Sequence, residues 1–229
     1  MKKFILAVCA CAVTAATLPG FAATSRGKLV NRLNSAAEVI HEIESIPAKS
    51  IPMSIMSNAT CVAVVPAYKK AAFVLGVTYG QGVVTCRTAR GWSAPAFIQL
   101  AGGSFGFQIG GQATDLVLIA VNRRGFQDLL KSKFKIGGDA AASAGPVGRN
   151  AAAATNLTLK SELLTYSRSR GLFAGIDLNG TVVNQNTSDT RAFYGHDVPF
   201  QQILGGNVAT PPAGRRFVRT IARYFHRSQ

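Results

Sequence analysis

The chain has 229 residues, of which 48% are hydrophobic and only 15% are charged, and its 25 Lys and Arg outnumber its 10 Asp and Glu. A hydrophobic content this high excludes an intrinsically disordered chain, and the length suffices for one domain with a sizeable core. After the first 18 residues no apolar run approaches the ~18 residues that would span a bilayer, so no integral membrane protein is indicated.

The N-terminal residues have the three-part layout of a secretory signal. Two lysines precede an apolar stretch over residues 4–18, and Gly20 and Ala22 supply the small residues of a cleavage site. This layout predicts a signal peptide over residues 1–22 and a protein exported to the periplasm or cell envelope. Cys11 lies in a degenerate lipid-attachment motif, so processing as a lipoprotein is the alternative.

The mature part begins with helical periodicity and continues with strand patterns. Apolar residues recur at spacings of three and four over residues 26–45, which predicts an amphipathic helix. A short second helix is expected over residues 51–58. Runs bounded by Gly, Pro or charged residues then indicate β-strands. These runs cover residues 61–65, 71–79, 82–88, 96–100, 104–109 and 116–122.

A helix over residues 123–133, two strands over 157–167 and 171–178, and a helical turn over 189–194 complete the predicted domain. The order predicts an α+β fold, in which N-terminal helices pack on a curved, mainly antiparallel sheet that approaches a barrel. We expect this domain to cover residues 23–205. The remaining residues, 206–229, are expected to form a linker and a C-terminal helix.

Two cysteines, Cys61 and Cys86, follow the predicted cleavage site. A disulfide between them would contribute about 3 kcal/mol. The expected strand over residues 71–79 separates their two strands, and the first and third strands of a meander lie about 9.5 Å apart, beyond disulfide reach. The bridge therefore requires a rearranged strand order, and both states stay open.

The sequence contains no recognisable catalytic set. The two cysteines lie 25 positions apart without a CxxC motif or paired histidines, so no metal site is expected. His41 lies beside glutamates on the first predicted helix, and no activated nucleophile accompanies it. We therefore expect neither an enzyme nor a cofactor.

Four separated motifs resemble the SYLF domain family of lipid-binding proteins. They are residues 94–97 after Trp92, residues 102–111 followed by 114–118, residues 144–149, and residues 166–175. The resemblance runs from about residue 35 to residue 195 and identifies the chain as an exported member of bacterial style. Eukaryotic relatives bind phosphoinositides, some through an added amphipathic helix, and some bind actin. The resemblance implies membrane lipid binding here.

The C-terminal residues 215–227, drawn as a helix, separate into a basic side and an apolar side. The basic side holds Arg215, Arg216, Arg219, Arg223 and Arg227, and the apolar side includes Phe217, Ile221, Tyr224 and Phe225. Such a helix is typical of segments that place aromatic rings in the acyl boundary and arginines on lipid phosphates. Two alternatives stay open: the apolar side docks on the protein's own sheet, or the segment is disordered in isolation.

The predicted function is non-enzymatic binding of anionic phospholipid or an anionic membrane surface, to which Lys69 and Lys70 in a turn add charge. The alternative is an envelope structural or adaptor protein that binds an acidic protein or polymer. Nucleic acid is not expected, because the sequence has no stacking motif that combines aromatic and basic residues.

Overall fold

The structure is a computed structural model that describes residues 25–45, 50–73, 75–105, 110–147, 161–169 and 172–226. Its helices are α1 (Arg26–Glu44), α2 (Met53–Asn58), α3 (Arg123–Leu130), α5 (Thr187–Tyr194), α6 (Phe200–Leu204), the 3₁₀ turn η1 (Pro212–Gly214) and α7 (Arg215–Tyr224). Its strands are β1 (Cys61–Phe73), β2 (Leu75–Thr88), β3 (Gly91–Trp92), β4 (Ala96–Phe105), β5 (Gly110–Ala120), β6 (Lys133–Lys135), β7 (Ala142–Ala144), β8 (Leu163–Ser169), β9 (Leu172–Gly175) and β10 (Val182–Gln185).

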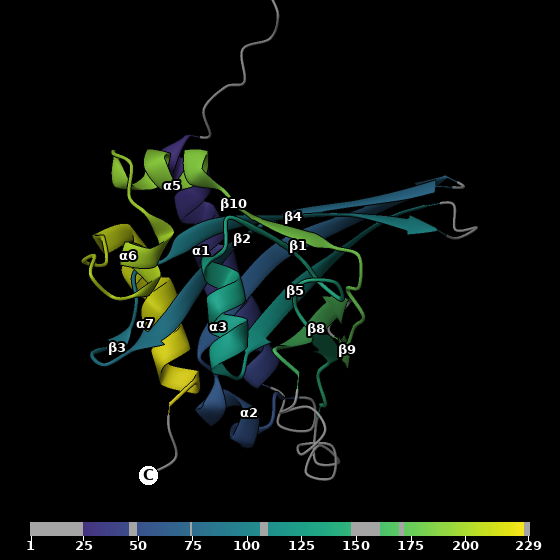
Figure 1. Cartoon of the computed structure of the whole chain (residues 1–229), viewed down its shortest axis with the longest axis horizontal. Coiled ribbons are helices and arrows are strands. Elements are labelled where there is room, and N and C mark those ends of the chain that lie inside the picture. Colours follow the sequence, from purple (N-terminus) through teal and green to yellow (C-terminus); the bar gives the residue numbers. More distant parts are fainter. Residues whose placement is uncertain are drawn as a thin grey trace, which may run out of the picture.

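The strands form one curved sheet in the order β6-β10-β4-β2-β1-β5-β8-β7, with β3 on β2 and β9 on β8. All pairings are antiparallel except that of β7 with β8. The described strands make a half-barrel with helices around it (Figure 1). The predicted α+β fold with a C-terminal helix is confirmed.

Helices cover both faces of the sheet in the body of the molecule. Val64, Val83 and Phe97 face a core that α1, α5 and α7 complete, whereas Val65 and Val84 face a second core that includes residues of α3 and α6. Successive strand residues point to opposite faces, so a strand covered on both sides is apolar at nearly every position. The continuous apolar runs of the sequence reflect this double burial.

The long hairpin of β1 and β2 corrects the predicted strand count. Three strands were expected between residues 61 and 88, but the structure has two, because the chain reverses inside the expected strand over residues 71–79. That stretch contains no Pro, Asn or Asp to signal a turn.

The corrected strand count makes the disulfide possible. Cys61 and Cys86 are direct partners in the β1–β2 register, their Cα atoms are 4.0 Å apart, and a disulfide joins them. The objection based on strand spacing was therefore wrong.

The far ends of four central strands extend beyond the helices and project from the body (Figure 1). We call this extension the wing and define it as residues 69–73, 75–79, 101–105 and 110–113. The expected strand over residues 104–109 falls partly here: β4 includes Phe105, and residues 106–109 lie outside the described residues. Within the described ranges, no helix has both the length and the apolar character needed to cross a bilayer.

Candidate functional site

Helix α7 begins directly after a tightly packed turn. Gly214 is buried, and a Cβ atom there would lie 3.0 Å from the Cγ atom of Pro95, so the turn fits closely against the domain. The helix runs from Arg215 to Tyr224 within the segment predicted from periodicity, 215–227. The last predicted residue, Arg227, lies outside the described residues.

The apolar side of α7 packs on the domain itself. The side chains of Phe217, Ile221 and Phe225 are fully buried in the core beneath α1. The hydroxyl of Tyr224 lies 2.7 Å from Nδ1 of His41 on α1. Insertion of these apolar side chains into a bilayer is therefore not possible in this structure, which has the docked arrangement that the sequence left open.

Arg87 holds the C-terminal end of α7 in place. Its guanidinium donates hydrogen bonds to the backbone carbonyls of Phe225 at 2.8 Å and Ala59 at 2.9 Å. It also lies 4.7 Å from the ring centroid of Trp92, whose ring meets Phe225 edge-on. A cation at this position complements the partial negative charge of a helix C-terminus. Arg87 is thus a structural residue of the α7 docking site.

The opposite side of α7 carries exposed arginines. Arg215, Arg216, Arg219 and Arg223 are all exposed. Arg216 forms an ion pair with Glu38 at 3.0 Å, and both of these side chains are half exposed. The backbone carbonyl of Arg215 accepts a hydrogen bond from Arg219. The docked helix therefore presents a fixed row of positive charge, which we call the arginine row.

Two of these arginines stand where a helix disfavours them. Arg215 and Arg216 lie in the first turn of α7, which contains no acidic residue. Positive charge near a helix N-terminus opposes the macrodipole and costs about 0.3–1 kcal/mol at an exposed position. Arg216 has Glu38 of α1 as its partner, so the uncompensated cost in that turn falls on Arg215.

Lys69 and Lys70 belong to the part of β1 that forms the wing, which projects away from α7 (Figure 1). They were expected in a turn, but both are inside β1, where Lys69 pairs with Tyr79 and Lys70 with Thr78. Lys69 is exposed and Lys70 is partly exposed. Neighbouring strand residues point to opposite faces, so the two amines extend from opposite sides of the wing.

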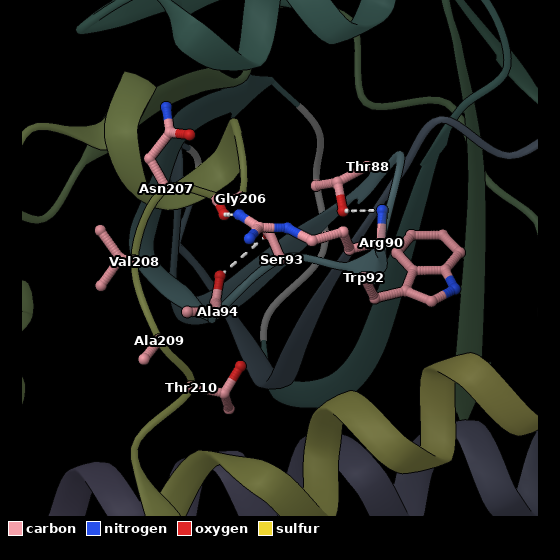
Figure 2. Close-up of a pocket in the computed structure, with 10 residues that line it drawn as sticks. All are labelled: Thr88, Arg90, Trp92, Ser93, Ala94, Gly206, Asn207, Val208, Ala209 and Thr210. Carbon is pink, nitrogen blue, oxygen red and sulfur yellow. Dashed lines mark hydrogen bonds between the residues drawn. The ribbon is translucent and has the colours of Figure 1, made fainter.

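A pocket lies between the β2–β3 turn and the segment that precedes α7 (Figure 2). Its volume is about 390 Å³. The guanidinium of Arg90 spans it and donates a 2.7 Å hydrogen bond to the carbonyl of Gly206. The lining residues are Thr88, Arg90, Trp92, Ser93, Ala94, Gly206, Asn207, Val208, Ala209 and Thr210. This polar cleft was not predicted from the sequence, because the segments that form it lie more than 100 positions apart.

No group of three or more His, Cys, Asp or Glu able to hold a metal ion occurs in the described part of the chain. His41 bonds Tyr224, and Asp197 bonds Arg191 at 2.6 Å. These polar groups connect structural elements to one another.

Comparison with known proteins assigns the family. A family model described as "Ysc84: Las17-binding protein actin regulator" matches residues 101–224, more than half of the chain. The chain belongs to the Ysc84 family. The resemblance to SYLF domain proteins is thereby confirmed. The matched residues end at the last residue of α7, so the docked helix lies inside the Ysc84 match.

Several Ysc84-like proteins are similar over most of this chain. The SH3 domain-containing YSC84-like protein 1 of Rattus norvegicus is 35% identical over 190 residues, which are 80% of this chain and 56% of that protein. Its Xenopus laevis counterpart is 34% identical over 201 residues, which are 84% of this chain and 60% of that protein. Protein YSC84 of Saccharomyces cerevisiae is 33% identical over 175 residues, which are 75% of this chain and 37% of that protein. The chain thus spans between about a third and three fifths of the length of these curated relatives.

Two of the motifs that carry the Ysc84 resemblance pack directly on each other. The ring of Tyr166 lies so close to Gly145 that a Cβ atom there would be 2.1 Å from the Cζ atom of the ring. A Cβ atom on Gly175 would in turn lie 2.5 Å from the carbonyl oxygen of Gly145. The two glycines are therefore needed for packing, and these motifs build the fold.

A half-buried glutamate, Glu44, interacts electrostatically with the same tyrosine. Burial raises the pKa of Glu44 from its ordinary 4.5 to about 7, against the lowering effect of a backbone hydrogen bond from Ile51. Burial also raises the pKa of the Tyr166 hydroxyl, and the charge of Glu44 adds to that shift. Among the described residues, neither Oε1 of Glu44 nor the hydroxyl of Tyr166 has a hydrogen-bond partner.

Proposed function

We propose that this domain is an exported, non-catalytic lipid-binding module that associates with anionic membrane surfaces through the arginine row of α7. The observation that carries the proposal is the exposed arginine row, which begins with Arg215 in the first turn of α7, where the helix dipole disfavours positive charge. A cost in stability at an exposed position is consistent with selection for binding.

The docked helix changes the mechanism expected from the sequence. Because its apolar side is buried in the protein core, α7 binds lipid phosphates electrostatically and does not insert. Each basic residue near an anionic surface contributes about 1 kcal/mol, and salt screens this attraction. Without residues 1–22, which hold two lysines and no acidic residue, the net charge falls from +15 to +13, and it adds a long-range attraction toward such a surface.

An acidic protein partner is the second candidate. The family description names Las17 binding and actin regulation, so at least some Ysc84 proteins act on protein partners. The same arginine row would suit an acidic protein surface or polymer in the cell envelope. The two candidates differ in one respect, because only the first predicts binding to protein-free lipid.

The test is co-sedimentation of the protein with neutral and anionic vesicles across a salt series. We expect binding to anionic vesicles only, with affinity that falls as salt rises. The variant Arg215→Gln with Arg219→Gln should lose roughly 2 kcal/mol of binding free energy, since each arginine contributes about 1 kcal/mol.

The matched control is Arg124→Gln with Lys133→Gln. It also removes two exposed charges, but from α3, which packs on the other face of the sheet, and from β6, the edge strand of the sheet. We expect it to bind nearly as well as the wild type. Equal losses in both variants would show that net charge acts without a site, and no binding by the wild type would favour an acidic partner.

A further inference from the structure

The apolar side chains of Val77 and Tyr79 lie on the same face of the wing. Val77 pairs with Ala71 on β1 and with Gly103 on β4, and Tyr79 pairs with Lys69 and Ala101. Directly paired residues share a face, so Val77, Tyr79 and Lys69 belong to one surface. The opposite surface has Thr78 between Gly76 and Gly80 on β2. We call the first surface the apolar wing face.

The apolar wing face continues a surface that helices cover in the body. Alternate residues of β2 lead from Val83, which packs in the core under α1, through Gln81 to Tyr79 and Val77. Gln81 accepts a hydrogen bond from Arg32 of α1, which marks the edge of the covered region. Beyond that edge, Tyr79 is 46% exposed and Val77 is 66% exposed.

This exposure is concentrated in one place. Among the described residues the exposed large hydrophobic side chains are Val77 and Tyr79 on the wing and Met53 on α2. Contiguous exposed apolar surface on a soluble domain marks a binding site more often than scattered single residues do. The wing also projects from the body, so a flat partner can reach it without contacting the helices first (Figure 1).

Charge on the wing selects the kind of partner. The sequence contains no Asp or Glu from residue 66 to residue 82 or from residue 101 to residue 114, but it contains Lys69 and Lys70. A second copy of this surface would bring lysines together with no carboxylate to pair with them. A bilayer with anionic headgroups supplies both apolar depth and negative charge, and tyrosine and lysine are suited to its interface.

From these observations we propose that the apolar wing face is the part of the protein that enters the acyl boundary of an anionic membrane, with Val77 and Tyr79 immersed and Lys69 on lipid phosphate. The inference deepens the proposed function and rests on it. The arginine row and the apolar wing face belong to the same side of the sheet, with α1 between them. The first attracts the protein to the surface, and the second inserts.

The test variant is Val77→Thr with Tyr79→Thr, which removes apolar character and keeps residues that favour strands. The matched control is Met53→Gln, which removes the exposed apolar side chain of α2. Unfolding curves would show that both variants fold. We expect the wing variant to bind anionic vesicles at least tenfold more weakly than the wild type at physiological salt, and the control to bind within twofold.

A second measurement reports how deeply the wing enters the bilayer. The chain has a single tryptophan, Trp92, which lies against the end of α7. The variant Val77→Trp places a second fluorescent tryptophan on the wing. With lipids brominated on their acyl chains, we expect strong quenching of the emission that the new tryptophan adds and little quenching of the wild type. Equal, weak quenching of both proteins would overturn insertion by the wing.

The outcomes separate the two proposals. If the wild type binds anionic vesicles, and the arginine variant loses binding while the wing variant does not, the proposed function stands and this inference fails. If the wing variant alone changes a dimer into a monomer and keeps vesicle affinity, the face is covered by a second copy, and the inference fails. Absence of any vesicle binding by the wild type would remove the proposed function and this inference with it.

Discussion

Helix α7 and the wing are both amphipathic, yet their apolar sides have different environments. Phe217 and Ile221 of α7 are fully buried against α1, whereas Val77 and Tyr79 of the wing remain exposed. Amphipathic periodicity therefore shows that a side chain is placed to leave water, but it does not show what covers it. In this protein the segment with the strongest membrane-like pattern is part of the core, and the exposed apolar surface lies on a sheet.

The largest expected effect is on stability, and it distinguishes the buried apolar side of α7 from the exposed apolar wing face. Phe217→Ala should lower the free energy of unfolding by about 3–5 kcal/mol, because it leaves a cavity in the core. Val77→Ala, at an exposed position, should change it by no more than about 0.5 kcal/mol. Urea unfolding of both variants measures the difference. Similar small losses would mean that α7 is not part of the folded core.

The disulfide gives the next largest effect, and it acts at the body end of the hairpin that forms the wing. Replacement of Cys61 and Cys86 by Ala should cost about 3 kcal/mol, as expected for a bridge that closes a loop of this length. Binding to vesicles by the folded variant should be unchanged, since the disulfide lies at the opposite end of β1 and β2. Weaker binding by the folded variant would show that the bridge positions the wing.

Glu44 makes the stability of the body depend on pH. Its pKa is about 7 in the folded protein and 4.5 ordinarily, so the unfolded chain loses the proton first as pH rises. Stability should fall between pH 4.5 and about 7 and then level off. Glu44→Gln should be more stable than the wild type at pH 8, with a smaller gain at pH 4.5. Thermal unfolding at the two pH values tests this, and an equal gain at both would contradict a raised pKa.

The smallest effect has opposite signs for stability and binding. Arg215→Gln removes a positive charge from the first turn of α7 and should stabilise the protein by about 0.3–1 kcal/mol. The same change should weaken binding to anionic vesicles by about 1 kcal/mol. A variant that loses stability and keeps its binding would show that Arg215 is structural.

Long periodic segments were predictable from the sequence, and long-range contacts were not. α1 and α7 follow from apolar spacing alone, because each runs through several turns. The strand β10 and the short helix α6 were not predicted, because four or five residues carry too little periodicity. The docking of α7 depends on Arg87, Trp92 and α1, and no pattern within α7 predicts those partners.

The wing shows where strand prediction fails. The reversal near residue 74 occurs within a run of Ala, Phe, Val and Leu that reads as one strand, so its two halves were not assigned to a hairpin. That error also produced the wrong objection to the disulfide. Val77 and Tyr79 are exposed because they lie beyond the part of the sheet that α1 covers. The sequence alone does not show where that part ends.

The most direct test uses the native fluorescence of Trp92, whose ring meets Phe225 edge-on at the end of α7. The protein should be bound to saturating anionic vesicles, with co-sedimentation as proof of binding. If α7 stays docked and binds through its arginines, the emission maximum of Trp92 and its quenching by acrylamide should match those of the free protein. A shift of the emission and a change in acrylamide quenching on binding would show that α7 leaves the core, which would contradict the account.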